Sequence, residues 1–199
     1  MALRPLISLP VLALSVASLL WASSFIALKV AFSYYDPMLV IFGRMFVACI
    51  CFAFFWKNFT NVRYLPGDWK PLVFMAFCEP CLYFVFEAMA LERTQASQAG
   101  MIVAMLPLMM AVAAHFLLGE IVSRRTLVGF SLAVIGAALL SVGAIQTEGA
   151  PNPVLGNFLE FLAMICATGY MITLKRLCVR YNPWFLTAVQ AIVGAIFFL

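Results

Sequence analysis

Long apolar runs separated by short polar segments are the dominant pattern along the chain. Six of these runs hold about 20 residues each, the length that an α-helix needs to cross a hydrocarbon core roughly 30 Å thick. The six runs and a shorter seventh cover residues 11–32, 37–56, 71–90, 97–118, 127–144, 158–174 and 183–199. The pattern predicts an all-α integral membrane protein with six complete transmembrane helices and a truncated seventh.

Composition supports the membrane assignment. Hydrophobic residues make up 66% of the 199 residues and charged residues 10%, whereas a soluble domain carries about 25% charged residues. The apolar run at the N-terminus continues to residue 32, beyond the roughly 7–15 apolar residues of a secretory signal. We therefore expect an uncleaved first helix in a multi-pass protein whose main partner is the lipid bilayer.

The loop charges predict the orientation. With the N-terminus inside, nine of the twelve Lys and Arg residues fall in cytoplasmic segments and two in outer loops, while Arg44 lies within a helix. Short cytoplasmic loops retain positive charge, so we expect a cytoplasmic N-terminus in a plasma membrane or bacterial inner membrane. The net charge of +4 reflects this topology and does not indicate a nucleic-acid partner.

The chain contains an internal repeat. Residues 14–53 align without a gap to residues 160–199, with nine of forty positions identical, including the pairs Lys29 and Lys175, Tyr35 and Tyr181, and Pro37 and Pro183. Five predicted helices separate the two starting points, so the copies point in opposite directions across the membrane. Inverted repeats are typical of transporters with the substrate site between the halves.

One polar stripe stands out inside the predicted helices. Glu79 lies about 12 Å from the inner end of its helix at 1.5 Å per residue, and Pro80 beside it should loosen the local helical hydrogen bonding. Tyr83 and Glu87 follow at four-residue intervals, on the same face. An ionisable group in a membrane is costly unless it is paired or hydrated. We interpret the stripe as a cavity lining, with a charge neutralised by a neighbouring helix as the structural alternative.

Arg44 is the expected neutralising partner. Its depth falls between those of Glu79 and Glu87, so we predict a structural ion pair. In the second copy of the repeat its place is taken by Gln190, which makes the two halves electrostatically different.

Four further residues are candidates for the substrate cavity. Trp21 and Ser24 lie near the middle of the first helix, although Trp in membranes prefers the interface. Gly169 and Tyr170 occupy the matching part of the sixth helix, where Tyr170 aligns with Ser24.

Other polar residues are expected at the membrane surfaces. Lys29 and Lys175 sit at helix ends and can extend to the lipid headgroups, and Glu160 is placed near the outer face, where solvation or a salt bridge accounts for it. His115 is expected at the inner interface, although its chemistry would suit coupling to a pH gradient.

The cysteines do not indicate redox chemistry or a metal. Cys78 and Cys81 have C-x-x-C spacing, but a thioredoxin-like motif needs a βαβ context, and Cys in apolar helices behaves as a small hydrophobe. No hydrolase motif or phosphate loop is present. We expect no metal, no cofactor and no enzymatic activity.

The chain also resembles the EamA-type permeases of the drug/metabolite transporter superfamily. The first matching block comprises residues 20–29, Asp36 with Pro37, Arg44 and Ala48. The second comprises Ala90, Leu91, Thr94, Ala96, Ser97, Ala99, Pro107, residues 118–120, Gly129 and Gly136. Together, in this order and spacing, the blocks are fairly specific.

The resemblance implies a ten-helix carrier built from two five-helix halves around a central cavity. Residues 11–144 would form the first repeat, and residues 158–199 the incomplete start of the second. It implies export of small metabolites, amino acids or drugs by alternating access. A membrane-embedded enzyme using Glu79, Glu87 or His115, and a non-transporting helper or scaffold with seven native helices, are the alternatives. Whether the protein forms a homodimer is left open.

Overall fold

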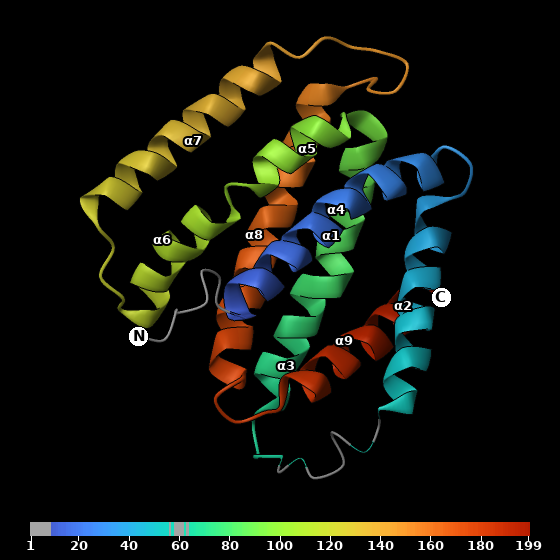
Figure 1. Ribbon diagram of the computed structural model, residues 1–199, viewed down its shortest axis with the longest axis vertical. Helices are drawn as coiled ribbons and strands as arrows, with labels where there is room; N and C mark the ends of the chain where they lie inside the picture. The colour runs from blue at the N-terminus through green and yellow to red at the C-terminus, as the bar shows by residue number, and fades with distance from the viewer. Residues whose placement is uncertain (1–8, 56, 58–61, 63) are drawn as a thin grey trace, which may run out of the picture.

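A computed structural model describes residues 9–55, 57, 62 and 64–199. These residues form a bundle of helices (Figure 1). In chain order, the elements are α1 (Leu9–Phe32), α2 (Pro37–Phe54), α3 (Trp69–Ala76), the π-helical segment η2 (Phe77–Leu82), α4 (Tyr83–Arg93), α5 (Ala96–Val103), α6 (Leu106–Leu118), α7 (Arg124–Val142), α8 (Pro153–Leu177) and α9 (Pro183–Phe197).

Six stretches of the described chain are long and apolar enough to cross a membrane, and the helix from Pro183 to Phe197 is shorter. Segments α3, η2 and α4 together make one span, as do α5 and α6. The predicted all-α membrane fold, with six long spans and a shorter seventh helix, is therefore confirmed. The division into two inverted repeats stays a prediction.

Three helices begin with the same local device. Asp36, Asn152 and Asn182 each precede a proline, and each side chain accepts a hydrogen bond from a backbone N–H of the first turn. A polar N-cap satisfies donors that the helix itself leaves free, and proline at the first position has no N–H to satisfy. The Asp36–Pro37 and Asn182–Pro183 pairs occupy matching positions in the sequence repeat.

The predicted span at residues 97–118 contains a break. Helix α5 ends at Val103 and α6 begins at Leu106. Pro107 lacks a backbone N–H, and its ring would clash with the carbonyl of Val103 four residues earlier in a continuous helix. The proline therefore sets the position of this break.

Helices α4 and α8 form the most extensive packed pair at the centre of the bundle (Figure 1). They pack closely because small residues face one another, with Ala88 and Ala90 on α4 and Gly156, Ala163 and Ala167 on α8 buried. A Cβ added to Gly156 would lie 2.8 Å from the backbone N of Thr94. Small residues at such contacts let helix backbones approach each other.

The outer faces of the bundle are apolar and exposed. None of the residues of α7 is buried, and large hydrophobic side chains such as Leu132, Leu139 and Phe116 are largely exposed. Lipid tails can surround such surfaces, because the side chains are apolar and the backbone polar groups along the helix are hydrogen-bonded to one another.

At the start of α3, one carboxylate joins two loops. Asp68, which is buried and precedes α3, accepts a hydrogen bond from the Tyr181 hydroxyl at 2.7 Å and pairs with Arg180 at 3.1 Å. Tyr181 also packs with Met75 and Leu186 in a buried apolar cluster. These contacts hold α3 against the connection between α8 and α9.

Candidate solute cavity

The third membrane span is interrupted at Glu79. This residue has φ −145° and ψ 120° within an otherwise helical segment, and its peptide bond to Pro80 is cis. The loosened hydrogen bonding predicted from Pro80 is therefore confirmed. The Glu79 carbonyl is free to accept a hydrogen bond, and Gln190 Nε2 of α9 donates one at 3.0 Å. Irregular backbone at membrane depth requires such partners from neighbouring helices.

A cavity of about 310 Å³ lies at this break. Six helical elements, from α1 to α8, contribute side chains to its wall. The lining residues are Trp21, Arg44, Glu79, Tyr83, Phe84, Glu87, Leu106, Ala167, Tyr170 and Met171. Five of the seven residues predicted to line a substrate cavity, together with Arg44, thus border one space.

Tyr83 and Glu87 act as a hydrogen-bonded pair within the wall. Both are buried, at 3% and 2% exposure, and the Tyr83 hydroxyl donates to Glu87 Oε1 at 2.8 Å. The four-residue spacing places them one above the other on α4. The polar stripe predicted from the sequence is therefore a connected feature of the cavity wall.

Arg44 reaches the cavity without forming the predicted ion pair. Its guanidinium carbon lies 4.9 Å from the centre of the Phe84 ring, a cation–π arrangement. Its Nη1 is buried and has no hydrogen-bond partner. None of the ion pairs found among the described residues, with N–O distances up to 4.0 Å, includes Arg44. It lines the same cavity as Glu79 and Glu87. The depth argument placed it correctly, but Phe84 occupies the position beside its charged plane.

Tyr170 closes the side of the cavity formed by α8. Its hydroxyl donates to Gln190 Oε1 at 3.3 Å, and the same Gln190 side chain holds the Glu79 carbonyl. Gln190 was predicted only as the counterpart of Arg44 in the second copy. Its role in supporting the helix break requires the tertiary contact between α9 and η2.

Two predicted cavity residues lie elsewhere. The Ser24 hydroxyl donates back to the Trp21 carbonyl at 2.7 Å, and Ser24 is not among the lining residues. Gly169 packs against α3 and η2, where an added Cβ would be 3.4 Å from Cys78 Sγ. Helix rotation explains both differences, because one residue step turns a helix by about 100°. Tyr170, one position on, faces the cavity.

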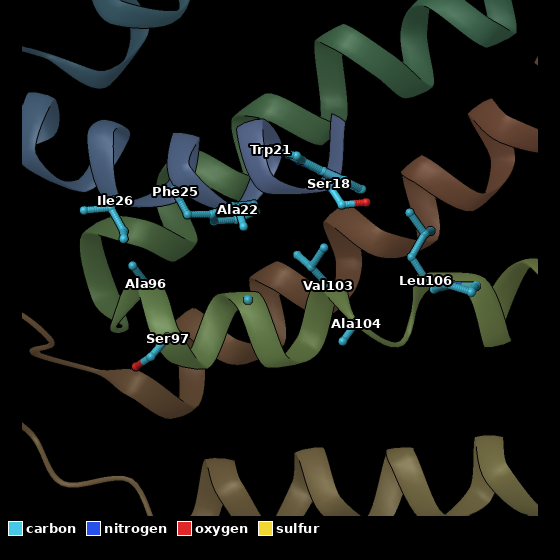
Figure 2. A pocket seen from close by; sticks show the side chains of 12 residues that line it. Ser18, Trp21, Ala22, Phe25, Ile26, Ala96, Ser97, Val103, Ala104 and Leu106 are labelled. Carbon is cyan, nitrogen blue, oxygen red and sulfur yellow. The ribbon is translucent and has the colours of Figure 1, made fainter. Parts of the chain in front are cut away.

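A larger apolar cavity adjoins the first. It has a volume of about 670 Å³ and lies between α1 and the segment formed by α5 and the start of α6. Figure 2 shows side chains such as Phe25 of α1 and Val103 of α5 projecting into it. Trp21 and Leu106 line both cavities. They form the wall between a polar compartment and an apolar one.

Glu160 is a buried residue that the sequence prediction placed wrongly. It was expected near the outer face, but its exposure is 0% and neither carboxylate oxygen has a hydrogen-bond partner. The error came from the helix start. The prediction began this helix at residue 158, whereas α8 begins at Pro153. The Asn152–Pro153 pair is a helix-start signal that would have moved Glu160 two turns into the span.

Lys29 also differs from its prediction. Its ammonium group donates to the backbone carbonyls of Leu91 and Thr94, the second at 2.7 Å, at the C-terminal end of α4. Helix ends leave carbonyls unsatisfied, and a cation there is favourable. Lys175, its partner in the repeat, behaves differently and forms an exposed ion pair with Glu120 at the C-terminal end of α8.

A polar network lies beside this cap. The Thr94 hydroxyl donates to Asn157 Oδ1 at 2.7 Å, and Asn157 Nδ2 donates to Gln98 and Ser141. It joins α5, α7 and α8 to the end of α4.

The described residues contain no group of three or more His, Cys, Asp or Glu side chains arranged to hold a metal ion. Cys78 and Cys81 are buried free thiols within η2. His115 lies in the last turn of α6, with Nδ1 2.7 Å from the Glu120 carbonyl.

The chain matches one known family and several known proteins. Residues 8–142 match the family described as the EamA-like transporter family. The chain is 25% identical over 129 residues to the uncharacterized transporter YetK of Bacillus subtilis (strain 168), covering 64% of this chain and 39% of that protein. It is 26% identical over 191 residues to an uncharacterized transporter of Archaeoglobus fulgidus, covering 94% of this chain and 65% of that protein.

A plant protein, the chloroplastic WAT1-related protein At3g02690 of Arabidopsis thaliana, is 28% identical over 132 residues, covering 65% of this chain and 31% of that protein. The chain thus spans less than two thirds of the length of these three relatives. No solved structure matches it significantly. The family match covers more than half of the chain and includes the helices that carry Trp21, Arg44, Glu79 and Glu87, so this multi-pass membrane protein belongs to the EamA-like transporter family.

Proposed function

We propose that the chain is part of a secondary transporter that exports small organic solutes by alternating access. The observation that carries the proposal is the convergence of Glu79, Glu87 and Arg44 on one cavity at an interrupted membrane helix. Broken helices beside a buried polar site are typical of secondary transporters. Ionisable groups inside a membrane commonly mark a solute or ion path.

The two adjoining cavities favour an amphipathic solute. The polar compartment presents carboxylates, a guanidinium and two tyrosines, which suit a charged or hydrogen-bonding head group. The apolar compartment, lined by side chains such as Phe25 and Val103, suits a hydrocarbon or aromatic body. Their volumes, about 310 and 670 Å³, lie within the range of small-molecule sites. Hydrophobic amino acids and organic amines have this chemistry.

Alternating access in this proposal uses the inverted repeat. Residues 11–144 would form the first half, and residues 158–199 would begin the second. Exchange of shape between the two halves would open the cavity first to the inner face and then to the outer face.

Counterflow in proteoliposomes tests the proposal. Liposomes that contain the whole protein are loaded with an unlabelled solute, and uptake of the same solute in tritiated form is measured. The measurement is repeated for a panel of hydrophobic amino acids and organic amines. At least one solute should exchange. The variant Glu79→Gln should abolish or alter this exchange while the protein remains folded in the membrane. The variant Glu92→Gln, whose carboxylate lies exposed on the same helix as Glu87, serves as the control.

Two further variants locate the site. Trp21→Ala removes a side chain shared by both cavities and should reduce exchange, whereas Ser24→Ala should leave it unchanged because Ser24 does not line either space. Failure of every panel solute to exchange in folded protein would contradict the proposal. Normal exchange by Glu79→Gln would remove Glu79 from the site.

A further inference from the structure

The buried carboxyl of Glu160 has no function in the cavity described above. It does not line the polar compartment, its exposure is 0%, and both oxygens lack a hydrogen-bond partner. An ionised carboxylate in such a place would be an uncompensated charge in a low-dielectric medium, which is strongly unfavourable. A proton on the carboxyl removes that charge.

Glu160 lies at nearly the same depth as a second buried carboxyl on the neighbouring helix α4. It is seven residues from the outer end of α8, and Glu87 is six residues from the outer end of α4. At 1.5 Å per residue the two depths are about 10 and 9 Å. Helices α4 and α8 pack against each other, and the two carboxyl groups interact electrostatically.

Glu87 links this pair to the solute cavity. It lines the polar compartment and accepts the hydrogen bond from Tyr83. Two negative charges on neighbouring buried carboxyls repel each other, so the pair favours states that share at least one proton. Glu160 is therefore on the protein side of the pair, and Glu87 is on the cavity side.

Few other ionisable groups face Glu160. On α4 these are Glu87 and Tyr83, both of which interact with it electrostatically. Glu79 of η2 and Arg44 of α2 act on Glu87 instead. The remaining charged groups of α3, α6 and α7 stand at the opposite, inner ends of those elements. These are Asp68, Lys70, His115, Arg124 and Arg125. Described residues of α5 include no ionisable side chain.

We propose that Glu160 and Glu87 form a proton-binding pair that couples proton movement to solute transport. In the conformation seen here, Glu160 holds a proton on one carboxylate oxygen. When the cavity opens, that proton passes to Glu87 and then to water, which leaves a carboxylate able to bind the next proton from the other side. The inference rests on the proposed transport function. Leu14 occupies the matching position in the first copy of the repeat, so only the second copy contributes this group.

Infrared spectroscopy of the purified whole protein tests proton binding directly. A protonated carboxyl has a carbonyl stretching band distinct from that of a carboxylate. Glu160→Gln should remove one such band at neutral pH, and Glu92→Gln, which changes an exposed carboxylate of α4, should not. Glu87→Gln should shift the pH at which the Glu160 band disappears, because it removes the neighbouring charge. If Glu160→Gln removes no protonated-carboxyl band, the proposal is overturned.

Proteoliposomes test the coupling. Glu160→Gln should still exchange, in counterflow, the tritiated amino acid or amine that the wild type exchanges. It should lose accumulation driven by an imposed pH gradient, which the wild type and Glu92→Gln should show. Accumulation equal to that of the wild type would refute the coupling. Absence of any exchange by the wild type would instead overturn the proposed function, while the infrared bands would still decide whether Glu160 holds a proton. If Glu160→Gln does not fold, Glu87→Gln provides both readouts.

Discussion

The Tyr83 hydroxyl donates a hydrogen bond to Glu87 Oε1 at 2.8 Å inside the bundle. The two residues lie one helical turn apart on α4, just after the break at Glu79. This contact orients the carboxyl that borders the candidate solute cavity. The local spacing creates the contact, and burial by α8 gives it energetic importance.

Removing the Tyr83 hydroxyl should weaken both stability and transport. Tyr83→Phe keeps the ring but leaves Glu87 without this donor, at a cost of about 0.6–1.5 kcal/mol for a hydrogen bond in a membrane protein. The free energy of unfolding, measured in mixed micelles, and the counterflow rate should both decrease. Tyr34→Phe, at a position with 78% exposure, is the control. Equal behaviour of the two variants would mean that the Tyr83 hydroxyl is dispensable.

Gly156→Ala should destabilise the protein by about 1–3 kcal/mol, the usual cost of overpacking. Its new Cβ would meet Thr94 at 2.7–2.8 Å, including a backbone atom that cannot move independently. Gly136→Ala on α7 has open space around it and should be neutral or slightly stabilising, because alanine favours helix. Unfolding in mixed micelles compares the two. Similar stability of both variants would show that α4 and α8 do not approach this closely.

Lys29→Met should cost about 1.5–3 kcal/mol, since hydrogen bonds to a charged group are lost and the terminal carbonyls of α4 lose their donor. Lys175→Met removes an exposed ion pair with Glu120 and should cost at most about 1 kcal/mol. The two lysines occupy matching positions in the repeat, so the comparison isolates tertiary context. A larger loss for Lys175→Met would argue against the capping role of Lys29.

Reporter fusions should determine the orientation proposed from the loop charges. A fusion after Leu65, between α2 and α3, should report the cytoplasmic side, and a fusion after Gln146, between α7 and α8, the outer side. Two intact reporters on the same side would contradict the predicted number of spans, and the inverted repeat would then fail with it.

The sequence predicted the candidate site better at some positions than at others. Trp21, Glu79, Tyr83, Glu87 and Tyr170 do border one cavity with Arg44, because depth and helical spacing follow directly from residue number. Ser24 and Gly169 were placed at the right depth but on the wrong face. The rotation of a helix about its axis depends on its packing partners. In a helix that is apolar on all sides, the sequence pattern does not indicate which face contacts them.

Glu160 and Lys29 illustrate a second limit. Both were assigned to membrane surfaces from their distance to predicted helix ends. A boundary error of five residues, from 158 to Pro153, was enough to convert a buried carboxyl into an apparently solvated one. Lys29 lies near a helix end as predicted, but the carbonyls that it contacts belong to another helix, 62 and 65 residues away in sequence.

The sequence alone determined the membrane environment, the number of long spans, the break at Pro80 and the shared helix starts at Asp36–Pro37 and Asn182–Pro183. These depend on local chemistry, namely apolar length, missing N–H groups and N-cap side chains. Only the tertiary structure decided which polar groups meet. The cavity, the Gln190 support of the Glu79 carbonyl and the isolation of Glu160 arise where α8 and α9 pack against the third span. Such contacts depend on the rotation and close approach of the helices, and neither can be derived from the local pattern of residues in one sequence.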